Sequence, residues 1–375
     1  MIYLDNAANT PVNEEVLETF IEATRKYIAN PNSSHKIGVA AKEAIDNAST
    51  HIAKYFHCNK ESIIYTSGAS ESNNLVLKGI AERNKKQGNH IIISALEHSS
   101  IIAPCNYLSS HGYDVSILPI TKEGIIDLEE LKNTINDRTI LVSICAVDSE
   151  LGTIQPINEI AKIVNKYPNC IFHTDATQAI GKTNIDFTGV DFITFAPHKF
   201  FGLNGFGALI NINNHKLIPL IHGGKSTTIY RSGTPVTANV LAMDKALTLA
   251  IDNLEQREKH IKELNKLLRE HFKKNKKIHI NSPENSIPNT LNISLIDTNT
   301  KEVLHKLEEK EIYLSTTTAC AIGDAPSKSV LAITGDKELA SNTIRISISY
   351  NTTKEDIDTF IKEFDNILKK YITKK

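Results

Sequence analysis

The sequence lacks the features that mark membrane, secreted and metal-cluster proteins. It has no run of about 18 or more apolar residues, which a transmembrane helix requires. Its N-terminus has neither the basic nor the apolar region of a signal peptide. The five cysteines are odd in number, irregularly spaced and without a Cys-x-x-Cys pair. That pattern argues against a disulfide framework or a zinc site, so we expect a cytoplasmic protein in a reducing compartment.

The chain also lacks an excess of either charge. It has 42 Lys and Arg against 43 Asp and Glu, a formal net charge of -1. This balance argues against a general nucleic-acid or membrane-surface binder. What the sequence does contain is typical of a globular protein, with 41% hydrophobic and 23% charged residues. Its 375 residues exceed one ordinary core, which predicts two domains.

Between residues 62 and 212, short apolar segments alternate with segments of helical periodicity. The alternation predicts right-handed crossovers and a mostly parallel α/β sheet with helices on both faces. The predicted strands lie at 62–65, 90–94, 114–118, 139–147, 170–174 and at both ends of 191–210, and the predicted helices include 14–27, 40–56, 127–135 and 157–166.

The alternation changes after residue 212. One long charged helix is predicted over 237–274. It joins a smaller α+β domain with strands at 277–280, 291–295 and 343–348 and helices at 301–310 and 354–371.

Lys199 is the one lysine in the otherwise apolar stretch 191–210, and His198 precedes it. Such a lysine is commonly a solvated side chain that keeps its amine in water. The alternative is a desolvated amine that is free to form a Schiff base. Three glycines follow it, which would let the backbone approach a bound group closely.

Three other loops follow predicted strands, where ligands bind in an open parallel sheet. Residues 66–71, Thr-Ser-Gly-Ala-Ser-Glu, could hold a phosphate at a helix N-terminus or could form an ordinary cap through a serine. Asp175 could meet a protonated ring nitrogen or a helix N-terminus, with Gln178 one turn further on. His98 could stack on a ring and handle protons, or could be a surface histidine.

No one of these positions identifies a ligand alone. Together they supply a Schiff-base lysine, a carboxylate for a pyridinium nitrogen, a phosphate cradle and a stacking imidazole. Pyridoxal phosphate requires this set. The sequence therefore predicts a pyridoxal-phosphate site at the carboxyl ends of the strands.

A succession of motifs over nearly the whole chain resembles the cysteine desulfurases of the NifS and IscS kind. This is a group of the class V aminotransferase family of fold-type I pyridoxal-phosphate enzymes. The motifs stand in family order, at 3–11, 30–35, 66–74, Glu97-His98, 175–178, His198-Lys199, 231–234 and 344–347. The resemblance implies a large cofactor-binding domain over 15–250 and a small domain over 251–375. It also implies an N-terminal arm, 1–14, that packs with the small domain.

The resemblance also implies a role for each cofactor-binding residue. Lys199 would hold pyridoxal phosphate as a Schiff base and shuttle protons, while Asp175 would keep the pyridine nitrogen protonated. Gln178 would bind the phenolic oxygen, and His98 would stack on the ring as a catalytic neighbour. The phosphate would be contacted by Ala69, Ser70 and His198, with Thr234 reaching in from the neighbouring subunit of a homodimer.

Cys320 lies in a loop of small residues that aligns with the family's catalytic-cysteine loop. Its thiolate would attack the sulfur of L-cysteine. L-Alanine would be released and the resulting persulfide would pass its sulfur to an acceptor protein. That acceptor would be an iron–sulfur scaffold or a tRNA-thiolating enzyme. Arg345 would bind the substrate carboxylate through a bidentate pair.

Several positions depart from the family pattern. Asp148 stands where an asparagine is usual near substrate and cofactor, and an ionised carboxylate there would repel the substrate unless protonated or turned away. Ala196 replaces a serine, which removes one phosphate hydrogen bond. Threonines at 316–318 would stiffen the cysteine loop. These changes leave open another class V enzyme, a selenocysteine lyase or an aminotransferase, or a cofactor-binding protein with degraded activity.

Overall fold

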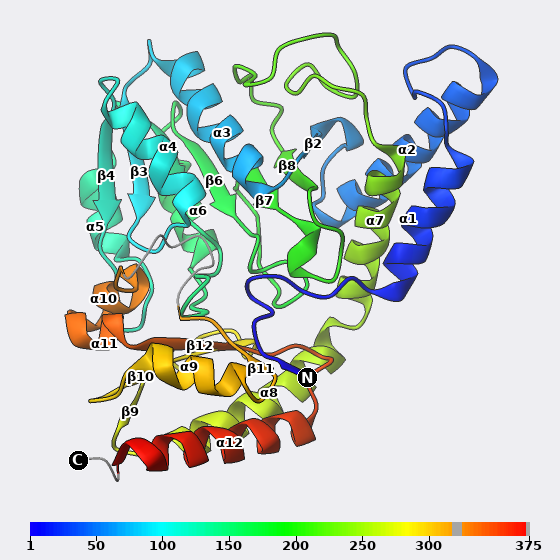
Figure 1. The fold of residues 1–375 in the computed structure, drawn as a ribbon. Helices are drawn as coiled ribbons and strands as arrows, with labels where there is room; N and C mark the ends of the chain where they lie inside the picture. The colour runs from blue at the N-terminus through cyan, green and yellow to red at the C-terminus, as the bar shows by residue number, and fades with distance from the viewer. Residues whose placement is uncertain (317–324, 373–375) are drawn as a thin grey trace.

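A seven-stranded sheet dominates the N-terminal two thirds of the chain (Figure 1). The computed structural model describes residues 1–316 and 325–372. Five neighbouring strands, β7, β6, β5, β3 and β4, run parallel, and β8 runs antiparallel to both of its neighbours, β2 and β7. The strands, in sheet order, are β2 (Ile63–Thr66), β8 (Gly207–Asn211), β7 (Phe192–Phe195), β6 (Ile171–Asp175), β5 (Thr139–Ser143), β3 (His90–Ser94) and β4 (Asp114–Leu118). The predicted class, a mostly parallel sheet flanked by helices, is confirmed.

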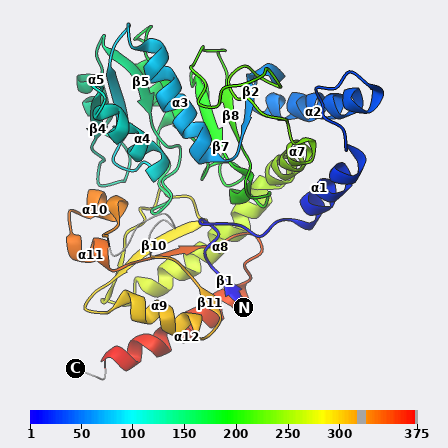
Figure 2. The ribbon, with the colours of Figure 1, turned by 45° about the horizontal axis from the view of Figure 1, so that its top comes forward.

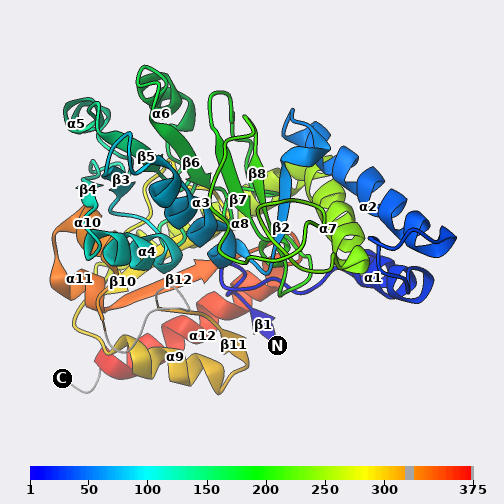
Figure 3. The same ribbon diagram turned by 90° about the horizontal axis from the view of Figure 1, so that it is seen from above.

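Both faces of the sheet are covered because successive strand residues point to opposite sides. In β3, Ile91 and Ile93 pack into the cluster under α3 (Ala69–Asn84) and α4 (Ser99–Ser109). Ile92 packs into the larger cluster on the other face. Figure 3 shows α3 and α4 on one side of the strands and α6 on the other. The second face is covered by α2 (Lys36–Tyr55), α6 (Ile157–Val164) and α7 (Thr237–Asp252), with α1 (Glu14–Lys26) against α7 and α5 (Leu128–Thr134) near α6.

The C-terminal part has its own hydrophobic cluster around a three-stranded antiparallel sheet. The N-terminal arm joins this part, because β1 (Ile2–Tyr3) pairs in parallel with β11 (Ile312–Tyr313) and Leu4 lies in the same cluster (Figure 2). The domain limits drawn from the sequence stay a prediction. The elements of this part are β9 (Ile278–Ile280), β10 (Thr290–Leu295), β12 (Thr343–Ser347), α8 (Leu254–Phe272), α9 (Thr300–Glu308) and α12 (Lys354–Ile372).

Two sequence predictions need correction, and two short helices were not predicted. The single helix over 237–274 is two helices, α7 and α8, because Asn253 leaves the helical conformation and the two helices pack in different clusters. The strand predicted to 147 ends at Ser143, although the N–H groups of Ile144 and Ala146 continue to bond carbonyls along β6. Two short helices, α10 (Lys328–Thr334) and α11 (Lys337–Ser341), have no counterpart in the prediction.

None of the helices within 1–316 and 325–372 is long and apolar enough to cross a membrane.

The buried His173 of β6 should make the fold sensitive to acid. Its ring bonds the hydroxyls of Ser143 and Thr194 at 2.8 and 2.9 Å, and burial lowers its pKa from 6.5 to about 4. Between about pH 4 and pH 6.5, His173 is protonated in the unfolded chain and neutral in the folded chain. Stability is therefore lost as pH falls through this window, by about 3 kcal/mol in total. Urea unfolding at several pH values should show a shallower pH dependence in a His173→Gln variant. Equal slopes would contradict the assignment.

Candidate active site at the carboxyl ends of the strands

A cavity of about 360 Å³ lies where strands β3, β5 and β6 end and helices α3 and α4 begin. The N-terminal arm closes one side of it and β12 contributes Arg345. The cavity thus gathers residues from segments that are far apart in the sequence. Eight of the predicted site residues line it, namely Ala69, Ser70, His98, Asp175, Gln178, His198, Lys199 and Arg345.

The loop before α3 is an uncapped helix N-terminus. The N-cap residue is Gly68, which makes no side-chain capping bond, so the serine cap considered from the sequence does not form. Gly207 of β8 approaches this loop so closely that a Cβ there would lie 2.6 Å from the Gly68 backbone. Glu71 lines the cavity, and Arg231 neutralises it through a 3.0 Å ion pair. The Ser67 N–H is taken by Glu71 Oε2 at 2.7 Å, so the N–H groups of the first turn of α3 are the ones that could meet an anion.

Lys199 ends a short 3₁₀ helix, Pro197–Lys199, that follows β7. Its Nζ donates to the carbonyl oxygens of Ala7, at 2.8 Å, and Ala8. The Lys199 amine is therefore bonded to the N-terminal arm at the wall of the cavity. This placement differs from the solvated lysine considered from the sequence. His198 beside it lines the same cavity, and burial, followed by the charges of Lys199 and Lys182, lowers its pKa to about 4.

A buried hydrogen-bond network joins Asp175 to His98. Asp175 accepts a bond from the amide of Asn73 at 2.7 Å and another from the N–H of Thr177 at 3.0 Å. The same Asn73 amide donates to Ser100 Oγ at 2.9 Å, and that hydroxyl lies 2.8 Å from His98 Nδ1. Because Nδ1 also accepts the Ser100 N–H, the ring proton is placed on Nε2.

The imidazole of this network is held neutral and aimed at the cavity. Burial lowers the pKa of His98, and the charge of Lys199 acts in the same direction against that of Asp175. Sequence reasoning missed Asn73 and Ser100. Asn73 is wholly buried in α3, where an amide needs partners, but that burial comes from tertiary packing and has no local sign in the sequence.

Glu97, the first residue of the Glu97-His98 motif, has a structural role. Its Oε1 accepts bonds from Ser94 Oγ at 2.6 Å and from the Cys145 N–H at 2.9 Å, which ties the end of β3 to the chain beyond β5. Burial raises its pKa to about 8. At neutral pH the Glu97 side chain is therefore mostly protonated, and its hydrogen bonds hold the segment behind the cavity in place.

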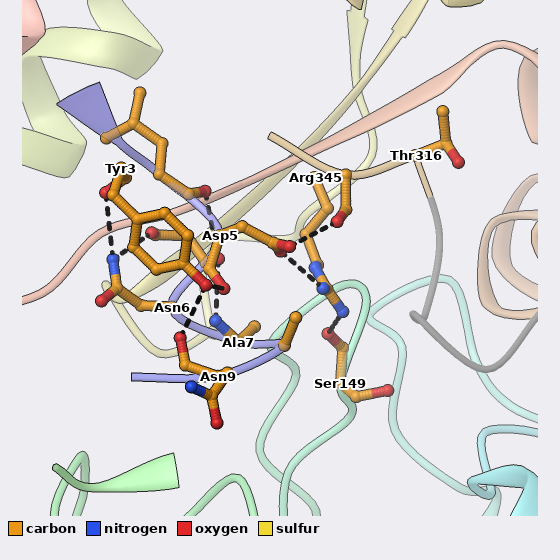
Figure 4. Close-up of polar contacts among 12 residues, drawn as sticks. Tyr3, Asp5, Asn6, Ala7, Asn9, Ser149, Thr316 and Arg345 are labelled. Carbon is orange, nitrogen blue, oxygen red and sulfur yellow. Dashed lines mark hydrogen bonds and ion pairs between the residues drawn. The ribbon is translucent and has the colours of Figure 1, made fainter. Parts of the chain in front are cut away.

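Arg345 is held from two sides at the rim of the cavity (Figure 4). Its side chain is 1% exposed. Nη2 bonds Asp5 Oδ1 of the N-terminal arm at 2.9 Å, and Nη1 donates to the Ser149 carbonyl at 3.1 Å. Ser315 Oγ bonds the other oxygen of Asp5 at 2.7 Å. The counter-ion Asp5 and the Ser149 carbonyl were not anticipated, because neither lies near Arg345 in the sequence.

Three predicted site residues are not brought into this cavity by the structure. Asp148 is turned into its own loop, where it accepts the N–H groups of Glu150 and Leu151 and the hydroxyl of Ser329, and burial raises its pKa. Thr234 is exposed and does not line the cavity of its own chain. Cys320 lies outside the described residues. The roles expected of these three stay predictions.

Comparison with known proteins places the chain in a family. Residues 2–360 match the aminotransferase class-V family. A cysteine desulfurase IscS of Dictyoglomus turgidum is 37% identical, over 99% of this chain and 95% of that protein. A mitosomal cysteine desulfurase of Encephalitozoon cuniculi is 37% identical, over 95% of this chain and 84% of that protein.

Solved structures agree with this placement. A NifS-like protein superposes with a TM-score of 0.92 at 34% identity, covering 98% of this chain and 99% of that one. A NifS-like protein from Rickettsia africae gives a TM-score of 0.87 at 33% identity, with coverage of 98% and 99%. The chain therefore belongs to the class-V aminotransferase family, among relatives of the NifS and IscS kind.

Proposed function

We propose that this protein is a pyridoxal-phosphate-dependent cysteine desulfurase, which converts L-cysteine to L-alanine and passes the sulfur through Cys320 to a protein acceptor. The observation that carries the proposal is that Lys199, Asp175 and Arg345, from three distant parts of the chain, line one cavity. Relatives that span the whole chain are cysteine desulfurases, which supports the choice of reaction.

The residues of the cavity fit pyridoxal phosphate. Lys199 would hold it through its amine, Asp175 through the ring nitrogen, and the uncapped N-terminus of α3 through the phosphate. Thr177 lines the cavity, and its buried hydroxyl has no hydrogen-bond partner within the described chain, as expected of a group that awaits a ligand. When bound, the cofactor supplies an electron sink for the bonds at the substrate Cα.

Three residues around the cofactor have separate roles in the proposed reaction. Arg345 would orient L-cysteine by its carboxylate. Its Nη1 and Nη2 already bond the Ser149 carbonyl and Asp5, so the carboxylate would share or replace these contacts. Lys199 Nζ, which faces the cavity, would carry the proton from Cα to Cβ as a general base and then a general acid. His98 would cover the cofactor ring with a neutral imidazole, whose proton the contact with the Ser100 N–H places on Nε2.

Cys320 completes the reaction in this proposal by the role that the family resemblance gives it. Its thiolate attacks the substrate sulfur, so that an S–S bond forms as the Cβ–S bond breaks, and Cβ takes up a proton to give alanine. The outer sulfur of the persulfide then passes to a thiol of an iron–sulfur scaffold or a tRNA-thiolating enzyme. A cytoplasmic homodimer, with Thr234 supplied across the subunit boundary, is part of the same proposal.

The proposal predicts that Cys320→Ala loses sulfur transfer. Alanine and sulfide production from L-cysteine by the loaded enzyme should fall at least about 100-fold, since the variant lacks the attacking nucleophile. The matched control is Cys58→Ala, a half-buried thiol outside the cavity, which should leave the rate unchanged. Undiminished alanine production by Cys320→Ala would refute this mechanism. Selective turnover of L-selenocysteine by the variant would instead indicate a lyase.

A further inference from the structure

Lys182 is a buried lysine for which the proposed reaction has no role. It lies in the turn after β6 and is 8% exposed. No carboxylate forms an ion pair with it in the part of the chain that the structure describes. Burial, followed by the charges of Lys199 and Arg345, lowers its pKa well below the ordinary value. An amine is costly to place in such surroundings, so its position needs an explanation.

The backbone directs this side chain into the interior. Gly181 adopts φ +73°, and a Cβ there would lie 2.8 Å from that of Ala250 and 3.0 Å from that of Phe200. The turn is therefore pinned between α7 and Phe200, and only glycine fits it. A small cavity of about 20 Å³, room for about one water, is lined by both Lys182 and Lys199.

A chain of hydrogen bonds connects Lys182 to the active-site cavity. Lys182 Nζ donates to Gln178 Oε1, and Gln178 Nε2 donates to the Ala7 carbonyl at 2.9 Å. Lys199 Nζ donates to that same carbonyl at 2.8 Å. A carbonyl only accepts, so the Ala7 contact fixes the NH₂ end of the Gln178 amide, and the donation from Lys182 Nζ to Oε1 holds the opposite end.

We propose that Lys182 is a positioning residue that locks the Gln178 amide with its NH₂ end toward the cavity. Gln178 lines the cavity, and one of its two N–H groups is used by Ala7. The second N–H is then aimed in advance at an oxygen of the ligand, and a donor fixed in advance costs no reorganisation on binding. Without Lys182 the amide oxygen loses its donor, and only the Ala7 carbonyl still opposes rotation of the amide. The inference rests on the proposed function, because it is the phenolic oxygen of pyridoxal phosphate that this donor would meet.

A double-mutant cycle tests whether Lys182 acts through Gln178. The variants are Lys182→Met, Gln178→Met and the double variant, and the readout is the dissociation constant of pyridoxal phosphate from absorbance titration of the cofactor-free chain. Replacement of a buried charge by a similar apolar side chain usually preserves the fold. Lys182→Met should weaken binding about tenfold and shift the absorbance maximum. In the Gln178→Met background it should change binding less than about twofold. The exposed Lys166→Met is the matched control and should bind as the wild type does.

Urea unfolding of the same four cofactor-free chains separates the two proposals. Coupling in both cofactor affinity and unfolding supports the positioning role. Coupling in unfolding alone shows a structural contact and overturns it, as does an equal loss of affinity in both backgrounds. If the wild-type chain fails to bind pyridoxal phosphate at all, the proposed function fails and the positioning role falls with it. The unfolding cycle still reports the contact between Lys182 and Gln178 in that case.

Discussion

Lys199→Ala should abolish alanine production from L-cysteine, by about 10⁴-fold or more, while the chain still folds. Lys199 is the one lysine in the described lining of the cavity, so no second amine can take its place. Its Nζ bonds two carbonyl oxygens of the N-terminal arm, those of Ala7 and Ala8. Neither residue belongs to a hydrophobic cluster, so the loss of these bonds should cost little stability. Lys199→Arg keeps the charge but offers no nucleophilic amine, and it should be as inactive as the alanine variant.

Chemical mapping makes this prediction specific to one residue. Borohydride treatment of the loaded wild-type chain, followed by proteolysis and mass spectrometry, should place the cofactor on the peptide that contains Lys199. Lys182 provides an internal comparison, because it is buried behind Gln178 and should carry no label. A label on Lys182, or substantial turnover by Lys199→Ala, would contradict the role given to Lys199.

Local sequence pattern was sufficient for the parts of the site that depend on strand ends. The strand at 90–94 and the strand at 114–118 were predicted with their observed limits, because both are short, β-branched runs bounded by turns. Asp175 ends a strand of the parallel part of the sheet, and His98 and Lys199 each follow one, and such ends converge at one edge. Their meeting in one cavity therefore follows from topology, which the alternation of strands and helices had indicated.

Contacts between distant segments could not be read from the sequence in the same way. Asn73 meets Asp175 across 102 positions, and Asp5 meets Arg345 across 340. No periodicity encodes either pair. Tertiary packing likewise overrides local preference at two other positions. Asp148 turns toward Ser329, and the helix breaks at Asn253 although the helical pattern of the sequence is uninterrupted there.

The second large effect is expected on stability and concerns the ion pair between Asp5 and Arg345. Asp5→Ala should lower the free energy of unfolding of the cofactor-free chain by about 3–5 kcal/mol, because it leaves a guanidinium that is 1% exposed without its counter-ion. The variant also loses the bond from Ser315 that helps to fasten the arm beside β11. The ion pair of Asp46 with Lys60, at 2.9 Å but well exposed, is the matched control, and Asp46→Ala should change stability far less.

Removing the arginine as well should distinguish a buried unpaired charge from a simple loss of packing. In the double variant Asp5→Ala with Arg345→Met, much of the lost stability should return, because no charge is left uncompensated in the interior. Urea unfolding of the four chains gives the coupling directly. The free charge in Asp5→Ala should also be the better partner for a carboxylate, so added L-alanine should raise its unfolding midpoint more than that of the wild type. If Asp5→Ala costs no more than Asp46→Ala, the ion pair between the arm and Arg345 does not contribute to the stability of the chain.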